Sequence, residues 1–290
     1  SKHTIEEMKA MESVFGIPIL LYMTIALGID VGEGESESDV YDKIFTLNAG
    51  ERGIYDRCWD RMGHPLTTKI KEQIHEVSKK MAYWMLEHEP EQLIIDWKSY
   101  QRILNEVGVD SSAMLGQYIH QIHHTEENIE SNGLVFIHKT IYEYFLARAI
   151  VDIVQNQLVY PVYPLEKEMT EQLTKLLNIR EIPMQTLIYL ERMIEKCVDS
   201  KAQEKMRKCE KYWRRYFESL LVNGMQYPLS EKNCCNLKII EKEITAFLNY
   251  LAVVKIILLK LSGKDRVWLV AKSEFMKLLS GYIKRSGERM

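Results

Sequence analysis

Hydrophobic residues recur at helical spacing along most of the chain, and the first such segment runs from Ile17 to Ile29. Its proline, Pro18, occupies a position that a first helical turn tolerates, and Gly28 stands near its end. The apolar run has about 13 residues, fewer than the roughly 20 that span a bilayer, so we read it as a buried helix. The segment 32–39 (GEGESESD) is acidic and rich in Gly and Ser, and it predicts an exposed loop.

The next stretch predicts two helices. Between residues 68 and 89 the apolar positions fall on one helix face, at Ile70, Ile74, Val77, Met81 and Met85. This helix is expected to end before Pro90, because proline cannot continue a helix from inside it. A second helix is expected from about Trp97 to Val107, where Gly108 stops it.

Further along, the pattern changes from helix to strand and back. Asp110 or Ser111 is the predicted N-cap of a third helix, whose apolar positions are Met114, Leu115, Tyr118 and Ile122. A turn at 131–133 (SNG) precedes the run 134–137 (LVFI), which predicts a short strand before a long helix. Three short helices, a turn, a strand and a further helix are compatible with a winged-helix module.

The rest of the chain is helix-rich, and we expect antiparallel helix pairs there. The helical candidates are 166–178, 183–197, 201–222, 241–261 and 265–284. Glycines and prolines between 50 and 65 mark a connector and a module boundary. The predicted fold is therefore mainly α: a helical domain at 1–60, a winged-helix-like domain with a short β-hairpin at 61–156, and a C-terminal helical domain at 157–290.

Composition adds little to this picture. The 290 residues are 46% hydrophobic and 27% charged with a net charge of −3, which is ordinary for a globular protein and argues neither for nor against a nucleic-acid partner. Five cysteines at irregular spacing suggest no disulfide framework, so reduced thiols are expected. No basic leader with an apolar stretch and a cleavage site is recognisable, and we expect a cytoplasmic protein without membrane contact.

Two short motifs define the functional hypothesis. They are Phe15–Leu21 (FGIPILL) and Phe136–Ala147 (FIHKTIYEYFLA), which begin about 120 residues apart. Together they resemble the NACHT branch of the STAND signalling NTPases. The first is similar to the G-x-P-L-L-L segment that opens the helical domain behind the nucleotide-binding core. The second, which is more specific, is similar to F-x-H-x-T/S-F-Q-E-Y/F-x-A-A of the winged-helix domain, and the resemblance covers roughly residues 1–155.

The resemblance implies that an upstream core of the same polypeptide holds ATP or ADP. Pro18 would then contact the adenine, and His138 would contact the β-phosphate of ADP and lock the closed state. A histidine at the start of a helix lies beside unsatisfied N–H groups, a setting that suits an anion. The tripeptide 143–145 is expected to be structural, with its aromatic residues in the core and Glu143 as a capping or ion-pair group.

The chain also departs from the family pattern. Ile141 and Tyr142 stand where the family usually has Phe and Gln. No G-x-x-x-x-G-K-[ST] segment is present, because Gly263 and Lys264 are followed by Asp265 and lack the earlier glycine. We therefore expect no enzyme activity and no cofactor in this chain itself, with ADP or ATP bound only by the full-length protein. A chain that begins at Ser1 suits a fragment of a longer protein.

Three plainer interpretations accompany these. His120, His123 and His124 form a cluster that we read as a solvated helix end rather than a zinc site, because no nearby Cys or carboxylate completes a ligand set. The basic stretch 201–215, with its interleaved aromatic residues, is read as a solvated amphipathic helix rather than a nucleic-acid contact. His138 without its motif would be a histidine satisfied by local hydrogen bonds at a strand–helix junction.

The sequence thus favours a regulatory and sensing segment of a NACHT-type NTPase that acts in signal transduction and defence. The expected partners are the upstream nucleotide-binding domain and a protein or ligand on the C-terminal helical domain. Two alternatives stay open: a nucleic-acid-binding winged-helix protein, and a helical scaffold whose contact surface is 157–290.

Overall fold

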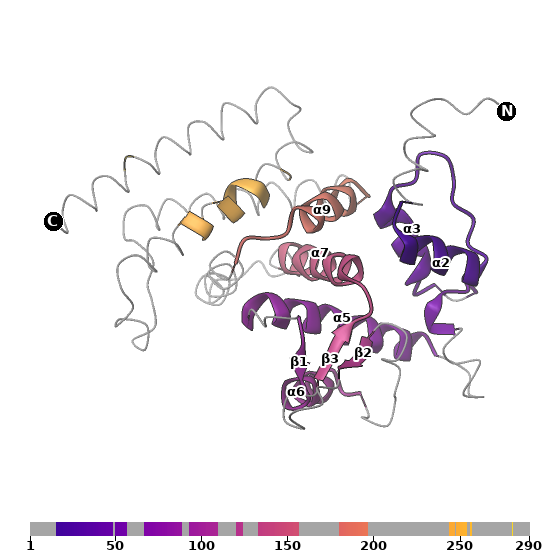
Figure 1. Ribbon diagram of the computed structural model, residues 1–290, viewed down its shortest axis with the longest axis horizontal. Helices are drawn as coiled ribbons and strands as arrows, with labels where there is room; N and C mark the ends of the chain where they lie inside the picture. Colours follow the sequence, from indigo (N-terminus) through magenta and orange to yellow (C-terminus); the bar gives the residue numbers. More distant parts are fainter. Residues whose placement is uncertain are drawn as a thin grey trace. The chain divides into compact units, whose positions relative to one another are not determined.

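A computed structural model describes part of the chain. The described residues are 16–48, 50–56, 67–88, 93–109, 120–123, 133–156, 180–196, 244–246, 248–253, 256 and 280. The chain divides into two compact units, Ser1–Ala149 and Ile150–Met290. The described part is mainly helical with one small antiparallel sheet, which confirms the mainly α prediction (Figure 1). None of its helices is long and apolar enough to cross a membrane.

The first helix, α2 (Pro18–Leu27), begins and ends where its sequence predicts. Pro18 is its first residue, and Gly28 closes it in the left-handed conformation at φ 66°. Leu20, Met23 and Thr24 are buried on one side, and α2 packs against the following helix, α3 (Glu37–Ile44). The apolar segment is therefore a helix, as expected, but it is only partly buried, because Tyr22 and Ile25 are exposed.

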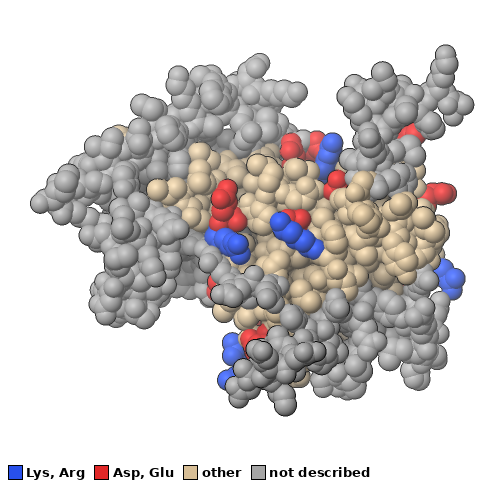
Figure 2. Space-filling view, in the orientation of Figure 1, with Lys and Arg blue, Asp and Glu red and all other residues tan. Residues whose placement is uncertain are grey.

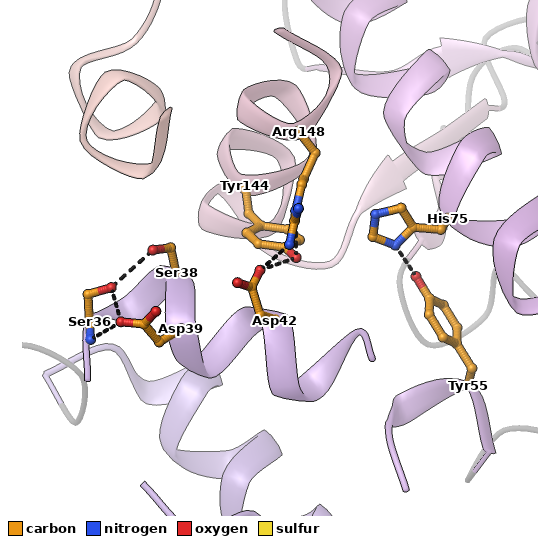
Figure 3. Close-up of polar contacts among 8 residues, drawn as sticks. All are labelled: Ser36, Ser38, Asp39, Asp42, Tyr55, His75, Tyr144 and Arg148. Carbon is orange, nitrogen blue, oxygen red and sulfur yellow. Dashed lines mark hydrogen bonds and ion pairs between the residues drawn. The ribbon is translucent and has the colours of Figure 1, made fainter. Parts of the chain in front are cut away.

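Helix α3 corrects the predicted loop at 32–39, because residues 37–39 form its first turn. Asp39 accepts hydrogen bonds from the backbone N–H and the hydroxyl of Ser36, both at 2.6 Å, so the acidic residue caps the helix (Figure 3). The pattern S-x-x-D was present in the sequence and indicates a helix start. Val40, Tyr41 and Ile44 bury the apolar side of this helix completely.

Helices α5 (Thr68–His88) and α6 (Trp97–Val107) confirm the next two predictions to within a residue. Asp96 caps α6 by accepting a hydrogen bond of 2.9 Å from the Ser99 N–H. Gly108 ends α6 with φ 75°, a conformation that side chains other than glycine rarely adopt. The strand β1 (Ile95–Asp96) immediately precedes α6.

Strand β1 belongs to a three-stranded antiparallel sheet in the order β1-β3-β2. Strand β3 (Gly133–Phe136) lies in the centre and confirms the predicted strand. Gly133 allows a close approach, since a Cβ there would lie 2.3 Å from the Ile95 carbonyl oxygen.

Strand β2 (His120–His123) overturns part of another prediction. The third helix was expected to reach Ile122, and His120 and His123 were read as neighbours on a helix end. Pairing with β3, in which His120 lies opposite Phe136, satisfies the backbone of this segment as a strand instead. The start of the predicted helix, at 110–119, and His124 lie outside the described residues.

Helix α7 (Lys139–Asn156) follows the sheet and supplies aromatic residues to the core of the first unit. Tyr144 and Phe145 are fully buried, and the ring of Phe145 lies 4.8 Å from that of Phe45 between centroids. Tyr41 and Tyr55 complete a cluster that joins α3, α7 and the segment after α3. This packing confirms that the aromatic residues of the second motif are core residues.

In the second unit, helix α9 (Met184–Lys196) confirms the predicted helix at 183–197. The described residues between 244 and 256 are helical, as predicted for 241–261. Their buried Asn249 holds the chain before α9, donating to the Arg180 carbonyl at 2.7 Å and accepting from the Ile182 N–H at 3.0 Å. The candidates 166–178 and 201–222, the basic stretch 201–215 and nearly all of 265–284 lie outside the described residues.

Candidate functional site

Pro18 occupies the first position of α2, where a backbone N–H would have no partner within the helix. The carbonyl of Ile17 accepts the first helical hydrogen bonds, from the N–H groups of Leu20 at 3.0 Å and Leu21 at 3.2 Å. The Pro18 ring is exposed, and Tyr22, one turn further along α2, is 67% exposed. The helix-start interpretation accounts for the backbone here and leaves the ring accessible for a contact.

His138 is the residue that connects β3 to α7 and caps the helix. Its carbonyl accepts hydrogen bonds from the N–H groups of Ile141 at 3.1 Å and Tyr142 at 3.4 Å. Its ring nitrogen Nδ1 accepts a third from the N–H of Thr140, at 3.2 Å. The side chain is half-buried. Local hydrogen bonds therefore satisfy one ring nitrogen, as the plainer interpretation of this histidine expects.

Two hydroxyl groups extend this cap into the core. The Thr140 hydroxyl oxygen lies 2.7 Å from His138 Nδ1, and the Tyr41 hydroxyl lies 2.5 Å from the Thr140 hydroxyl. Tyr41 comes from α3, so the contact joins the first helical segment to the second motif. Burial raises the pKa of Tyr41, so that its hydroxyl keeps its proton at physiological pH.

An ion pair also joins α3 to α7, at Asp42, the residue that follows Tyr41. Asp42 Oδ1 lies 2.5 Å from Arg148 Nη2 and accepts a hydrogen bond of 2.8 Å from the Tyr144 hydroxyl (Figure 3). Arg148 Nε donates to the same hydroxyl at 3.2 Å, and the guanidinium lies 5.6 Å from the centroid of the Tyr144 ring. Burial raises the pKa of Tyr144, which stays a neutral donor.

Sequence reasoning assigned Tyr144 to the core and missed this polar role. Arg148 stands four residues after Tyr144, so their contact across one helical turn was readable from the sequence. Asp42 lies 106 residues before Arg148, and no local pattern links the two.

Glu143 is an almost fully buried carboxyl group on the first turns of α7. Burial raises its pKa, and the nearby Lys139 opposes this shift. The Lys139 Nζ lies 3.5 Å from Glu143 Oε1, one helical turn apart. The predicted ion-pair role of Glu143 is confirmed.

The core of the same unit holds two further polar pairs that the sequence did not indicate. His75 of α5 is buried, and its Nδ1 lies 3.1 Å from the Tyr55 hydroxyl (Figure 3). Burial, with smaller contributions from the charges of Arg148 and Lys79, lowers the pKa of His75 to about 3. The second pair joins the buried Lys71 to Asp56 at 2.7 Å.

The two predicted site residues belong to the same compact unit, but none of the contacts described above joins Pro18 to His138. Helix α3 connects them indirectly, since it packs on α2 and reaches His138 through Tyr41 and Thr140. Within the described residues, no group of three or more His, Cys, Asp or Glu side chains is placed to hold a metal ion. Figure 2 shows acidic and basic side chains close together among the described residues of one face.

Comparison of the chain with families, curated proteins and solved structures finds no match. The two motifs and the geometry around His138 are therefore the features that bear on function.

Proposed function

We propose that this chain is the non-catalytic regulatory segment of a NACHT-type STAND NTPase, which couples the ADP or ATP state of an upstream core to the sensing of a partner or ligand. The observation that carries the proposal is the place of His138. Within the motif FIHKTIYEYFLA, it stands between a strand and a long helix and caps that helix with Nδ1. The other ring nitrogen, Nε2, would contact the phosphate of ADP.

The order of elements supports a winged-helix module around this histidine. Helix α5, the short strand β1, helix α6 and the pair β2–β3 follow one another, and β1 pairs with β3. A helix, a short outer strand, a helix and a β-hairpin are among the parts of a winged helix, and the place of its third helix, 110–119, lies outside the described residues. This arrangement is the reason to propose such a domain at 61–156.

The start of α7 carries the partial positive charge of a helix N-terminus, and its N–H groups at Thr140, Ile141 and Tyr142 donate to His138. The first N–H groups of a helix carry a partial positive charge and attract phosphate. Because His138 would belong to a different module from the phosphate-binding loop, one contact would join two domains only while ADP is bound. The exposed ring of Pro18 at the start of α2 would contact the adenine from the first module.

Contacts between α3 and α7 would carry this signal through the segment. Asp42 of α3 binds both Tyr144 and Arg148 of α7, and Tyr41 reaches Thr140 beside His138. A shift of the start of α7 would therefore move α3 with it. The C-terminal helical region would present the sensing surface.

The proposal is tested by comparing ADP binding of the wild-type polypeptide, including the proposed upstream core, with ADP binding of its His138→Ala variant. Loss of a hydrogen bond to a charged phosphate weakens binding by roughly 10- to 100-fold. We expect that loss of ADP affinity, together with faster ADP release, in equilibrium dialysis and stopped-flow measurements. His88→Ala is the matched control, since His88 is an exposed histidine at the end of α5. Equal ADP affinity of wild type and His138→Ala would refute the proposal.

The same order of helix, strand, helix and hairpin is compatible with a second function, that of a nucleic-acid-binding winged helix. Phosphate contacts by Lys and Arg are strongest at low salt. Binding of duplex DNA or RNA that weakens steeply with added salt would favour this candidate, and absence of binding at low salt would remove it. The basic stretch 201–215, which also motivates this candidate, lies outside the described residues.

A further inference from the structure

We infer that Tyr41 and Thr140 are positioning residues that hold His138 in the tautomer with its proton on Nε2, and so make this histidine a neutral hydrogen-bond donor for a phosphate oxygen. The ligand in this statement rests on the proposed function. The tautomer rests only on the contacts around Nδ1.

The backbone decides which ring nitrogen accepts. The N–H of Thr140 lies 3.2 Å from His138 Nδ1, and a backbone N–H can only donate. Nδ1 must therefore present its lone pair. A neutral imidazole carries one N–H, which then belongs to Nε2.

The contact of the Thr140 hydroxyl implies the same tautomer. It lies 2.7 Å from the same Nδ1, which has no hydrogen to give, so the hydroxyl donates as well. Its oxygen is then free to accept from Tyr41, whose hydroxyl lies 2.5 Å away. The donors form one chain from Tyr41 through Thr140 to His138, and each bond polarises the next.

The first donor of this chain is firmly held. Tyr41 is fully buried, and its ring contacts those of Phe45 and Tyr144. The next residue of α3, Asp42, is bound by Arg148 of α7. The packing of α3 on α7 thus places the Tyr41 hydroxyl over Thr140, and a helix remote in sequence sets the proton position of His138.

The tautomer restricts the ligand. An Nε2–H group donates to an oxygen of a phosphate or carboxylate, whereas binding of a metal ion at Nε2 requires the proton to leave. A proton on Nδ1 would break the hydrogen bond from the Thr140 N–H, which can only donate. The arrangement thus favours an anion bound through a neutral imidazole.

Nitrogen-15 labelling of the histidines in the 290-residue chain tests the inference directly. Long-range proton–nitrogen spectra, recorded at about pH 8 where an ordinary imidazole is neutral, distinguish a protonated from an unprotonated ring nitrogen. The His138 signals are assigned as those missing in His138→Gln. We expect a protonated Nε2 and an unprotonated Nδ1 in wild type, and a wild-type Nδ1–H would overturn the inference without any variant.

Variants then test the two hydroxyl groups. Thr140→Val removes one donor and keeps the backbone N–H, so the Nδ1–H fraction of His138 should rise about fivefold, the effect of one typical hydrogen bond. Thr140→Ser should restore the wild-type ratio, and Tyr41→Phe should shift it in the direction of Thr140→Val. A rise that Thr140→Ser does not reverse, or an unchanged ratio in Thr140→Val, would overturn the inference.

Tyr55→Phe is the matched control, because it removes the hydroxyl beside the buried ring of His75 and should alter only the His75 signals. The spectra need no nucleotide. An unchanged ADP affinity in His138→Ala would therefore refute the proposed function alone, and an unchanged tautomer ratio would refute this inference alone.

Discussion

Two histidines of the same compact unit have opposite surroundings. His75 lies inside the core with its Nδ1 3.1 Å from the Tyr55 hydroxyl, whereas His138 is half-buried at the start of a helix. The environment of His75 penalises its charged form, because the ring is surrounded by aromatic residues such as Phe145. A buried, neutral histidine of this kind makes stability depend on pH.

Acid should destabilise the fold through His75. Burial lowers its pKa to about 3 in the folded chain from the ordinary value of 6.5, so the unfolded chain binds the extra proton. The stabilising contribution is complete above about pH 6.5 and is lost as pH falls towards 3, at up to about 1.4 kcal/mol per pH unit. Urea unfolding between about pH 7 and 4.5 should show a weaker pH dependence for His75→Gln than for wild type.

His88→Gln provides the comparison for that series, because His88 is an exposed histidine of the same helix. Its unfolding free energy should follow the wild-type pH dependence. Parallel curves for wild type and His75→Gln would show that His75 is not the group responsible.

The sequence could predict a feature of a single residue only where the contacting residue lies nearby along the chain. The position of His138 before a helix followed from the local pattern of strand and helix. The hydroxyl chain to Tyr41 did not, because Tyr41 and Thr140 are 99 residues apart and become neighbours only by packing. The burial of His75 was not predicted either, because a single histidine among the apolar positions of a helix does not by itself indicate a buried hydrogen bond.

Among the elements, the contact of α3 with α7 is the one on which the proposed signal depends. Asp42 is partly shielded from solvent and binds both Arg148 and Tyr144. Removal of one member of such a network leaves the guanidinium without its counter-charge.

Asp42→Ala should therefore lower the free energy of unfolding by about 2 kcal/mol, the range for a hydrogen-bonded charged group that is not fully buried. Urea denaturation measures the change. Lys80→Ala is the control, since it breaks the exposed Lys80–Glu106 pair and should cost less than about 1 kcal/mol. Equal losses for the two variants would contradict a structural role for Asp42.

The elements that the sequence predicted well have their signals at their own ends. Helix α6 begins at the cap Asp96 and ends at Gly108, and both signals are local. Helix α3 was missed because the acidic composition of 32–39 outweighed the cap formed by Ser36 and Asp39. Strand β2 was missed for another reason: it depends on pairing with β3, and an apolar residue such as Ile122 fits either a helix or a strand.

For the chain as a whole, the division into two compact units has a thermodynamic consequence. The bonds of Asp42 lie in the unit Ser1–Ala149, and those of Asn249 to Arg180 and Ile182 lie in the other. Each set holds together segments that are far apart in sequence. Mutations in groups that share no contact usually have additive effects on stability.

Asn249→Ala removes two bonds to backbone groups and should destabilise the chain by about 2 kcal/mol, because the Arg180 carbonyl and the Ile182 N–H lose their described partner. The variant with both Asp42→Ala and Asn249→Ala should lose the sum of the two single effects, to within about 0.5 kcal/mol. Urea unfolding of the four proteins of this cycle measures the coupling. An interaction term clearly above about 0.5 kcal/mol would mean that the two units depend on each other, and the α3–α7 contact would then report on the state of the C-terminal helices.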